Sequence, residues 1–179
     1  MNGETAIAIP VPGAEPVAGP WRVRFDPASV EAGVPAHITL LYPFRPAAAI
    51  DEAEMERLAA FFAARPASDV TLAGLCGFRG VLYLAPEPSA PLDVLIRDLA
   101  ARYPDTPPYA GEIADPIPHV TVSVDDSPQT VEYLARATVD AYARGALPIR
   151  TRLDSVALME CDEDDRWRII ATFPFAPPG

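Results

Sequence analysis

Lysine is absent from this chain. All 14 basic residues are arginine, against 25 acidic residues, and the formal net charge is −11. Proteins that hold long nucleic acids normally carry a basic stripe for the backbone phosphates, so this balance argues against a duplex or a long RNA as partner. Arginine still suits bidentate contacts with a single phosphate. The composition therefore favours a small anionic ligand over a long one.

Cysteine and long hydrophobic runs are also scarce. Cys76 and Cys161 lie far apart in apolar surroundings, which favours reduced core residues over a disulfide. Charges and prolines interrupt every hydrophobic stretch, and the first thirty residues lack the pattern of a signal peptide. We therefore expect a cytoplasmic monomer with no membrane partner, formed by a single domain over residues 1–179.

The spacing of apolar residues predicts alternating strands and helices. Pro16 and Pro20 should limit any early helix, residues 21–25 alternate like a strand, and 26–33 read as a loop or single turn. Strands are expected at 5–11, 36–42, 68–78, 81–85, 119–124, 147–159 and 167–173, and helices at 51–64, 92–103 and 128–143. The proline-rich stretch 104–118 should cross between two lobes.

The order strand, helix, hairpin occurs twice in this reading. The first copy covers about 36–86 and the second about 118–174, and each is opened by a histidine. A duplicated βαββ-like plan with a site between its halves is the economical interpretation.

The two histidines carry the same local pattern. His37 and Thr39 share one face of their strand, as do His119 and Thr121, because strand side chains alternate. Ser123 extends the second polar face. An imidazole exchanges a proton near neutral pH, and a hydroxyl beside it can bind a phosphoryl oxygen. Two such pairs facing each other predict acid–base chemistry on a phosphodiester without a metal or other cofactor.

A lone histidine in an apolar strand is more often a structural residue than a catalyst. Here both histidines of the chain follow a proline and precede a hydroxyl residue two positions on. With ordinary serine and threonine usage, the second coincidence alone occurs on the order of once in a hundred. The pairing therefore favours function.

The segments Pro-Ala-His-Ile-Thr-Leu-Leu-Tyr-Pro-Phe, at 35–44, and Pro-His-Val-Thr-Val, at 118–122, resemble the two signature motifs of the 2H phosphoesterase superfamily, in its LigT-like, 2′-5′ RNA ligase-type branch. The resemblance implies an α+β, bilobal, pseudo-two-fold fold with two antiparallel sheets flanked by helices around a central cleft. It implies no metal, and activity on a 2′,3′-cyclic phosphate or a 2′-5′ linkage of a small nucleotide or RNA end.

By the same resemblance His37 and His119 are the acid and base, and Thr39 and Thr121 hold the phosphate. Many RNA-acting members place a basic residue shortly after the second motif, where this chain has Ser-Val-Asp-Asp at 123–126. That departure argues against RNA as the substrate more than it argues against phosphoester chemistry.

Other residues have weaker claims. Tyr42 and Phe44 are candidates to stack on a base, but strand parity points them away from His37, and core packing is the alternative. Four arginines on strand edges could reach a phosphate or be solvated: Arg24, Arg79, Arg150 and Arg152. The acidic run 162–165 reads as a hairpin turn, and a zinc site of both histidines and both cysteines lacks every familiar ligand spacing.

Two classes of function remain open. The first is a metal-independent phosphoesterase, and the second is a phosphate- or nucleotide-binding regulatory module without turnover. Two intact histidine–threonine pairs favour the enzyme, because a binder has no need of two proton carriers. Ligation or another group transfer at the same site uses the same proton transfers and stays open.

Overall fold

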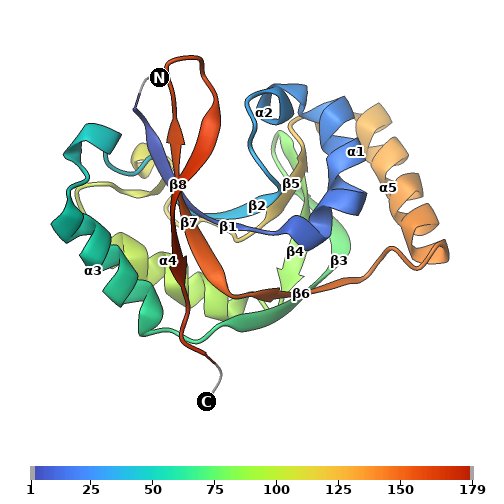
Figure 1. The fold of residues 1–179 in the computed structure, drawn as a ribbon. Coiled ribbons are helices and arrows are strands. Elements are labelled where there is room, and N and C mark those ends of the chain that lie inside the picture. The colour runs from blue at the N-terminus through green and yellow to red at the C-terminus, as the bar shows by residue number, and fades with distance from the viewer. Residues whose placement is uncertain (1–2, 178–179) are drawn as a thin grey trace.

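The computed structural model describes residues 3–177 as an α+β fold, built on one curled antiparallel sheet (Figure 1). The strands are β1 (Thr5–Pro10), β2 (His37–Leu41), β3 (Ser68–Phe78), β4 (Val81–Glu87), β5 (Val120–Ser123), β6 (Ile149–Leu153), β7 (Ser155–Cys161) and β8 (Trp167–Pro174). The helices are α1 (Glu15–Phe25), α2 (Pro27–Glu31), α3 (Glu52–Ala63), α4 (Ala90–Arg102) and α5 (Pro128–Ala143), with short 3₁₀ turns at Pro12–Ala14, Ala47–Ala49 and Pro108–Gly111. No helix in this range is long and apolar enough to cross a membrane.

The strand order β6-β3-β4-β5-β2-β1-β7-β8 explains the bilobal plan. The two strands that begin at the histidine motifs, β2 and β5, are neighbours at the centre, with three strands on each side. Helices α3 and α4 pack on β8 and β2, whereas α1 and α5 pack on β5 and β3 (Figure 1). The predicted fold class is confirmed, and its two predicted sheets are hydrogen-bonded into one through β2 and β5.

Most predicted elements agree with the structure. The helix at 128–143 matches α5, and Ser127 caps it by accepting a hydrogen bond from the Thr130 amide. Helix α3 likewise begins after Asp51, whose carboxylate accepts the amide hydrogen of Glu54 at 2.7 Å. Caps and apolar spacing therefore locate these helices from local sequence alone.

The prediction for residues 15–25 was wrong. They form helix α1 in place of a proline-limited segment followed by strand-like alternation, whereas the five-residue α2 lies where a loop or single turn was expected. Pro16 sits in the first turn, where its missing amide hydrogen costs nothing, while Pro20 lies inside the helix. Burial of Val17, Ala18 and Trp21 in the core offsets the cost of Pro20.

The predicted strand 147–159 was also wrong, because the chain divides there. Strand β6 pairs with β3 in one half of the sheet, and β7 pairs with β1 in the other. Only Asp154 separates them, and neither glycine nor proline marks the break.

Both cysteines are free as expected, but Cys76 is exposed while Cys161 is buried. The assignment of two sequence repeats stays a prediction.

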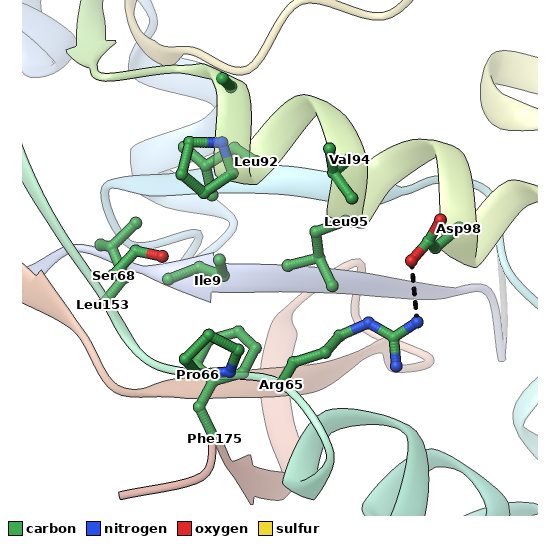
Figure 2. A pocket seen from close by; sticks show the side chains of 12 residues that line it. Ile9, Arg65, Pro66, Ser68, Leu92, Val94, Leu95, Asp98, Leu153 and Phe175 are labelled. Atoms are coloured by element: carbon green, nitrogen blue, oxygen red, sulfur yellow. Dashed lines mark hydrogen bonds and ion pairs between the residues drawn. The ribbon is translucent and has the colours of Figure 1, made fainter. Parts of the chain in front are cut away.

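A cavity of about 400 Å³ opens on the sheet face that carries Ile9, between helix α4 and the segment after α3 (Figure 2). Leu95, Leu153 and Phe175 give it an apolar lining, and the polar contact shown across it is the ion pair between Arg65 and Asp98, 3.0 Å long. Ile9 pairs with Ile38 of β2, so this cavity lies on the opposite face from the residues that flank Ile38.

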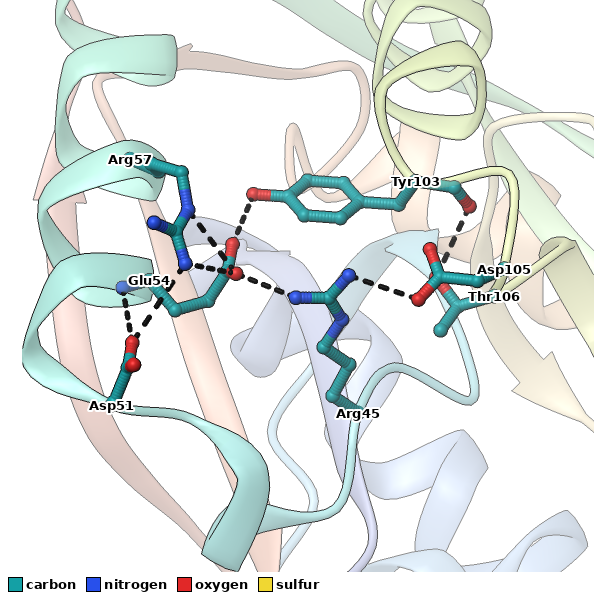
Figure 3. A network of polar contacts seen from close by, with 7 residues as sticks. All are labelled: Arg45, Asp51, Glu54, Arg57, Tyr103, Asp105 and Thr106. Carbon is teal, nitrogen blue, oxygen red and sulfur yellow. Dashed lines mark hydrogen bonds and ion pairs between the residues drawn. The ribbon is translucent and has the colours of Figure 1, made fainter.

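A buried carboxylate joins the loop after β2 to helices α3 and α4 (Figure 3). Glu54, only 2 % exposed, accepts hydrogen bonds from Arg45 at 2.6 Å, Arg57 at 2.8 Å and the Tyr103 hydroxyl at 2.6 Å. Arg45 also donates to Asp105 at 2.9 Å. Burial alone would raise the pKa of Glu54, but these donors and the charge of Arg45 outweigh it and hold the pKa below its usual value.

Replacing Glu54 by glutamine should destabilise the fold by about 2 kcal/mol at pH 7, because three donors lose a buried anion. The matched control is Glu132→Gln, which breaks an exposed pair with Arg136 and should cost roughly 0.5 kcal/mol or less. Since the folded pKa of Glu54 is lowered, its contribution is present above about pH 4.5 and is lost as the pH falls through the folded pKa. Urea unfolding at several pH values measures both effects; equal costs for the two variants would contradict them.

Candidate active site

The pairing of β2 with β5 places both motifs on one face of the sheet. Ile38 lies opposite Val120, and both side chains are completely buried. The residues on either side of them must therefore point to the other face. In an antiparallel pair this register sets His37 across from Thr121 and His119 across from Thr39. The four predicted residues form a crossed quartet, with the histidines on a diagonal.

The two imidazoles are oriented in the same way. Nδ1 of His37 lies 2.8 Å from the Pro35 carbonyl oxygen, and Nδ1 of His119 lies 2.6 Å from that of Ile117. A carbonyl oxygen only accepts, so each Nδ1 carries its hydrogen, and the neutral ring presents an Nε2 lone pair. Nε2 of His37 lies 3.1 Å from the Thr39 hydroxyl. Both rings are thus prepared to accept a proton at Nε2.

Burial lowers the pKa of both histidines. For His37 the charges of Arg22 and His119 lower it further, against the Pro35 hydrogen bond and the Asp26 carboxylate, which raise it. For His119 the hydrogen bond to Ile117 partly opposes burial. The electrostatic effect of His119 on His37 agrees with their diagonal placement. An anion between the rings would raise both pKa values and favour protonation.

Helix α1 forms one wall of the site. Arg22 is almost completely buried and donates to the Val34 carbonyl at 2.7 Å, while Glu15 accepts the amide hydrogen of Ala36 at 2.6 Å. These bonds fix the backbone just before His37. Arg22, Asp26, His37 and Thr121 share a cavity of about 140 Å³. Sequence reasoning missed Arg22, because its segment was not recognised as a helix.

Aromatic side chains form the second wall. His37, Thr39, Tyr42 and Trp167 line a cavity of about 230 Å³, and the Tyr42 and Trp167 ring centroids are 6.0 Å apart. Burial and the Glu4 carboxylate raise the pKa of Tyr42 to about 12, so this phenol stays neutral. Strand parity predicted that Tyr42 points away from His37, which is wrong. Strand β2 ends at Leu41, so the alternation does not extend to Tyr42.

The ring of His119 rests against two further aromatics. Its centroid is 5.2 Å from that of Phe78 and 5.4 Å from that of Tyr83, both edge-to-face. Phe78 and Tyr83 belong to the β3–β4 hairpin, which pairs with β5. Their apolar character was visible in the sequence, but their position beside His119 depends on strand order, which local patterns do not reveal.

Two predicted binding residues are placed elsewhere. Phe44 is buried and packs edge-to-face on Tyr103 at 5.1 Å. Ser123 is fully buried, and its hydroxyl donates to the Asp125 carbonyl at 2.7 Å, so it stabilises the turn before α5. Ser123 was predicted from strand alternation, and core packing was the alternative for Phe44, which is where the structure places it.

None of the four predicted arginines lines the two cavities beside His37. Arg24 stacks on Tyr133, Arg79 is exposed, and Arg150 and Arg152 line a separate cavity with Asp69 and Glu87. Within residues 3–177 no three or more histidine, cysteine, aspartate or glutamate side chains gather as a metal site.

Comparisons with known proteins bear on the family and the fold. The sequence model of the 2′-5′ RNA ligase superfamily matches residues 9–165. The fold is similar to the crystal structure of E. coli LigT complexed with 3′-AMP (TM-score 0.60, 16% identity, 98% of this chain and 99% of that chain covered). It is equally similar to one described as a phosphoesterase (TM-score 0.59, 17% identity, 98% and 99% covered). A search of curated protein sequences finds no match.

This chain therefore belongs to the 2′-5′ RNA ligase superfamily. Its fold is LigT-like, in agreement with the resemblance of the two motifs to those of the 2H phosphoesterase superfamily.

The histidine titrations test the site electrostatics directly. With only two histidines in the chain, NMR should resolve both, as Nδ1–H tautomers with midpoints below the ordinary 6.5. Their contribution to stability is then complete above pH 6.5 and is lost as the pH falls toward the folded pKa values, since the unfolded chain binds more protons there. The urea-unfolded chain is the control and should show two ordinary midpoints. A midpoint above 6.5 in the folded protein would refute this account.

Proposed function

We propose that this protein is a metal-independent phosphoesterase that acts on a 2′,3′-cyclic phosphate or 2′-5′ phosphodiester of a small nucleotide or RNA end. The observation that carries the proposal is the crossed quartet, with two identically oriented imidazoles on one face of adjoining strands. One neutral Nε2 takes the proton of the attacking water or hydroxyl, and the other, protonated, donates to the departing oxygen. Thr39 and Thr121 bind the phosphoryl oxygens.

The walls of the site support a small substrate. Arg22 brings a positive charge beside His37 in a protein whose net charge is −11. Tyr42 and Trp167 offer aromatic faces on which a nucleobase can stack. LigT has been crystallised with 3′-AMP, ATP and NADP⁺. A mononucleotide-sized ligand therefore suits both the charge balance and the cavities.

Replacing either His37 or His119 by alanine should lower turnover of a 2′,3′-cyclic nucleotide by about 10²- to 10⁴-fold, with substrate binding less affected. The double variant should lose less than the product of the singles, because the two act as a unit. The rate should follow a bell in pH with two apparent constants that belong to the pair, and excess chelator should leave it unchanged. A requirement for added divalent metal, or full activity in both single variants, would end the assignment.

The threonine hydroxyls should account for a large part of phosphate affinity. Calorimetry with a nucleoside monophosphate should show roughly tenfold weaker binding for each of Thr39→Val and Thr121→Val, since each loses a hydrogen bond to a charged oxygen. Thr138→Val is the matched control, because the Thr138 hydroxyl donates only to the Leu134 carbonyl within α5. Unchanged affinity in both site variants would argue against these roles.

A further inference from the structure

Asp26 is a buried carboxylate without a partner, at the junction of α1 and α2. Its side chain is only 5 % exposed, and its amide donates to the Arg22 carbonyl at 2.7 Å, where α1 ends. Its carboxylate does not cap α2, and within residues 3–177 it accepts no hydrogen bond and forms no ion pair. Buried charges are normally paired or hydrogen-bonded, so this one points to a function.

The neighbouring cation does not neutralise Asp26. Arg22 lies four residues earlier in α1, a spacing at which ion pairs form on helices. Its guanidinium instead donates to the Val34 carbonyl at 2.7 Å and faces the Glu15 carboxylate at 3.7 Å. The two opposite charges are thus held apart, and both line the cavity of about 140 Å³ beside His37.

The Asp26 oxygens face this cavity. Within residues 3–177, the side-chain oxygen that is sealed off from open space without a partner belongs to Glu4. The oxygens of Asp26 have no partner either, so they must touch open space, and the cavity is the space that this buried residue lines. The electrostatic effect of Asp26 on His37 agrees with this placement. The carboxylate is therefore available to a hydrogen-bond donor inside the cavity.

The cavity distinguishes two imidazoles that are otherwise oriented alike. His37 borders it; burial lowers the pKa of His37, and the Asp26 carboxylate is among the groups that oppose this effect. Around His119, the described part of the chain places the Phe78 and Tyr83 rings, and no carboxylate acts on its pKa. Space for a small polar group with an anion behind it therefore lies beside His37.

A water molecule matches the acceptors of this cavity. The Asp26 carboxylate accepts one of its hydrogens. Nε2 of His37 accepts the other once Thr39, whose hydroxyl is 3.1 Å away, turns its own hydrogen to a phosphoryl oxygen. A water molecule occupies about 30 Å³ in the liquid, so the cavity of about 140 Å³ has room for it. With both hydrogens donated, its lone pairs are left for the phosphorus.

The cavity also sets the direction of attack. It adjoins the edge of the crossed quartet that His37 and Thr121 form. The opposite edge is formed by Thr39 and His119. Attacking and departing oxygens lie roughly in line in phosphoryl transfer, so a nucleophile beside Asp26 places the departing oxygen nearest His119.

We propose that Asp26 is a catalytic residue that holds the attacking water against Nε2 of His37. The inference rests on the proposed function, and it assigns His37 as the base and His119 as the acid. The water oxygen forms a bond to phosphorus while one of its protons passes to Nε2 of His37. The bond from phosphorus to the departing ester oxygen breaks, and His119 gives that oxygen its proton. Asp26 keeps the hydrogen bond from the second O–H, and its charge stabilises the imidazolium that forms.

The test begins with Asp26→Asn, which keeps the shape of the side chain. With a 2′,3′-cyclic nucleotide, kcat should fall about tenfold, because the amide oxygen accepts a weaker hydrogen bond and carries no charge. Asp26→Ala removes the acceptor as well and should lose up to about 100-fold. Asp140→Asn is the matched control, because it removes the same charge from an exposed position on α5, and it should behave as wild type. An unchanged kcat in Asp26→Asn overturns the proposal.

Binding separates this role from contact with the ligand itself. Both Asp26 variants lose a negative charge beside the phosphate, so their affinity for adenosine 3′-monophosphate should stay equal or rise in calorimetry. Weaker binding by both variants would mean that Asp26 holds a hydroxyl of the ligand, and it would overturn the proposal.

Two further backgrounds test the pairing of Asp26 with His37. In His37→Ala, the change Asp26→Asn should cost little more, because the water has already lost the base that takes its proton. In His119→Ala, the loss of about tenfold should remain. The reverse pattern would assign the base to His119 and overturn the proposal. If wild type hydrolyses no phosphodiester, the proposed function fails; if wild type is active and Asp26→Asn equals it, this inference alone fails.

Discussion

The short contact between β2 and β5 is the constraint on which the site depends. One register pair, Ile38 with Val120, joins the two halves of the sheet and buries both side chains on one face. Strand alternation then requires His37 and His119 to share the opposite face. A slip of one residue in this pairing would turn one histidine and its threonine into the core. The buried pair at the centre of the sheet therefore sets the geometry of the candidate site.

The electrostatics follow from the same placement. The imidazole rings of His37 and His119 share one face of adjoining strands and are packed against neighbouring side chains. This burial lowers the pKa of each ring. The lowered pKa values favour the base form of both rings at neutral pH. A bound phosphate supplies the negative charge that restores a proton to one of them. Ligand binding and protonation are therefore coupled in the proposed mechanism, and the acid form becomes favourable only when there is a substrate to receive its proton.

Sequence patterns predicted the parts of this site that depend on local periodicity. His37, Thr39, His119 and Thr121 were found because strand alternation and repeated spacing are visible in one dimension, and so were helices with clear caps such as α5. Contributions from tertiary packing were missed or misassigned. Helix α1 was not predicted, because burial of its apolar face outweighs the cost of its internal proline. The division of β6 from β7 was not predicted, because no glycine or proline marks it. The burial of Phe44 and Ser123 depends on tertiary packing.

The site thus has two kinds of component with different origins. The crossed quartet comes from two short neighbouring strands, β2 and β5. The walls come from α1, β8 and the β3–β4 hairpin, which lie outside both motifs in the sequence. In the proposed function, these walls are the parts of the site that contact the ligand beyond its phosphate. In the proposed function, the quartet therefore carries the proton transfers, and the walls distinguish one phosphodiester from another.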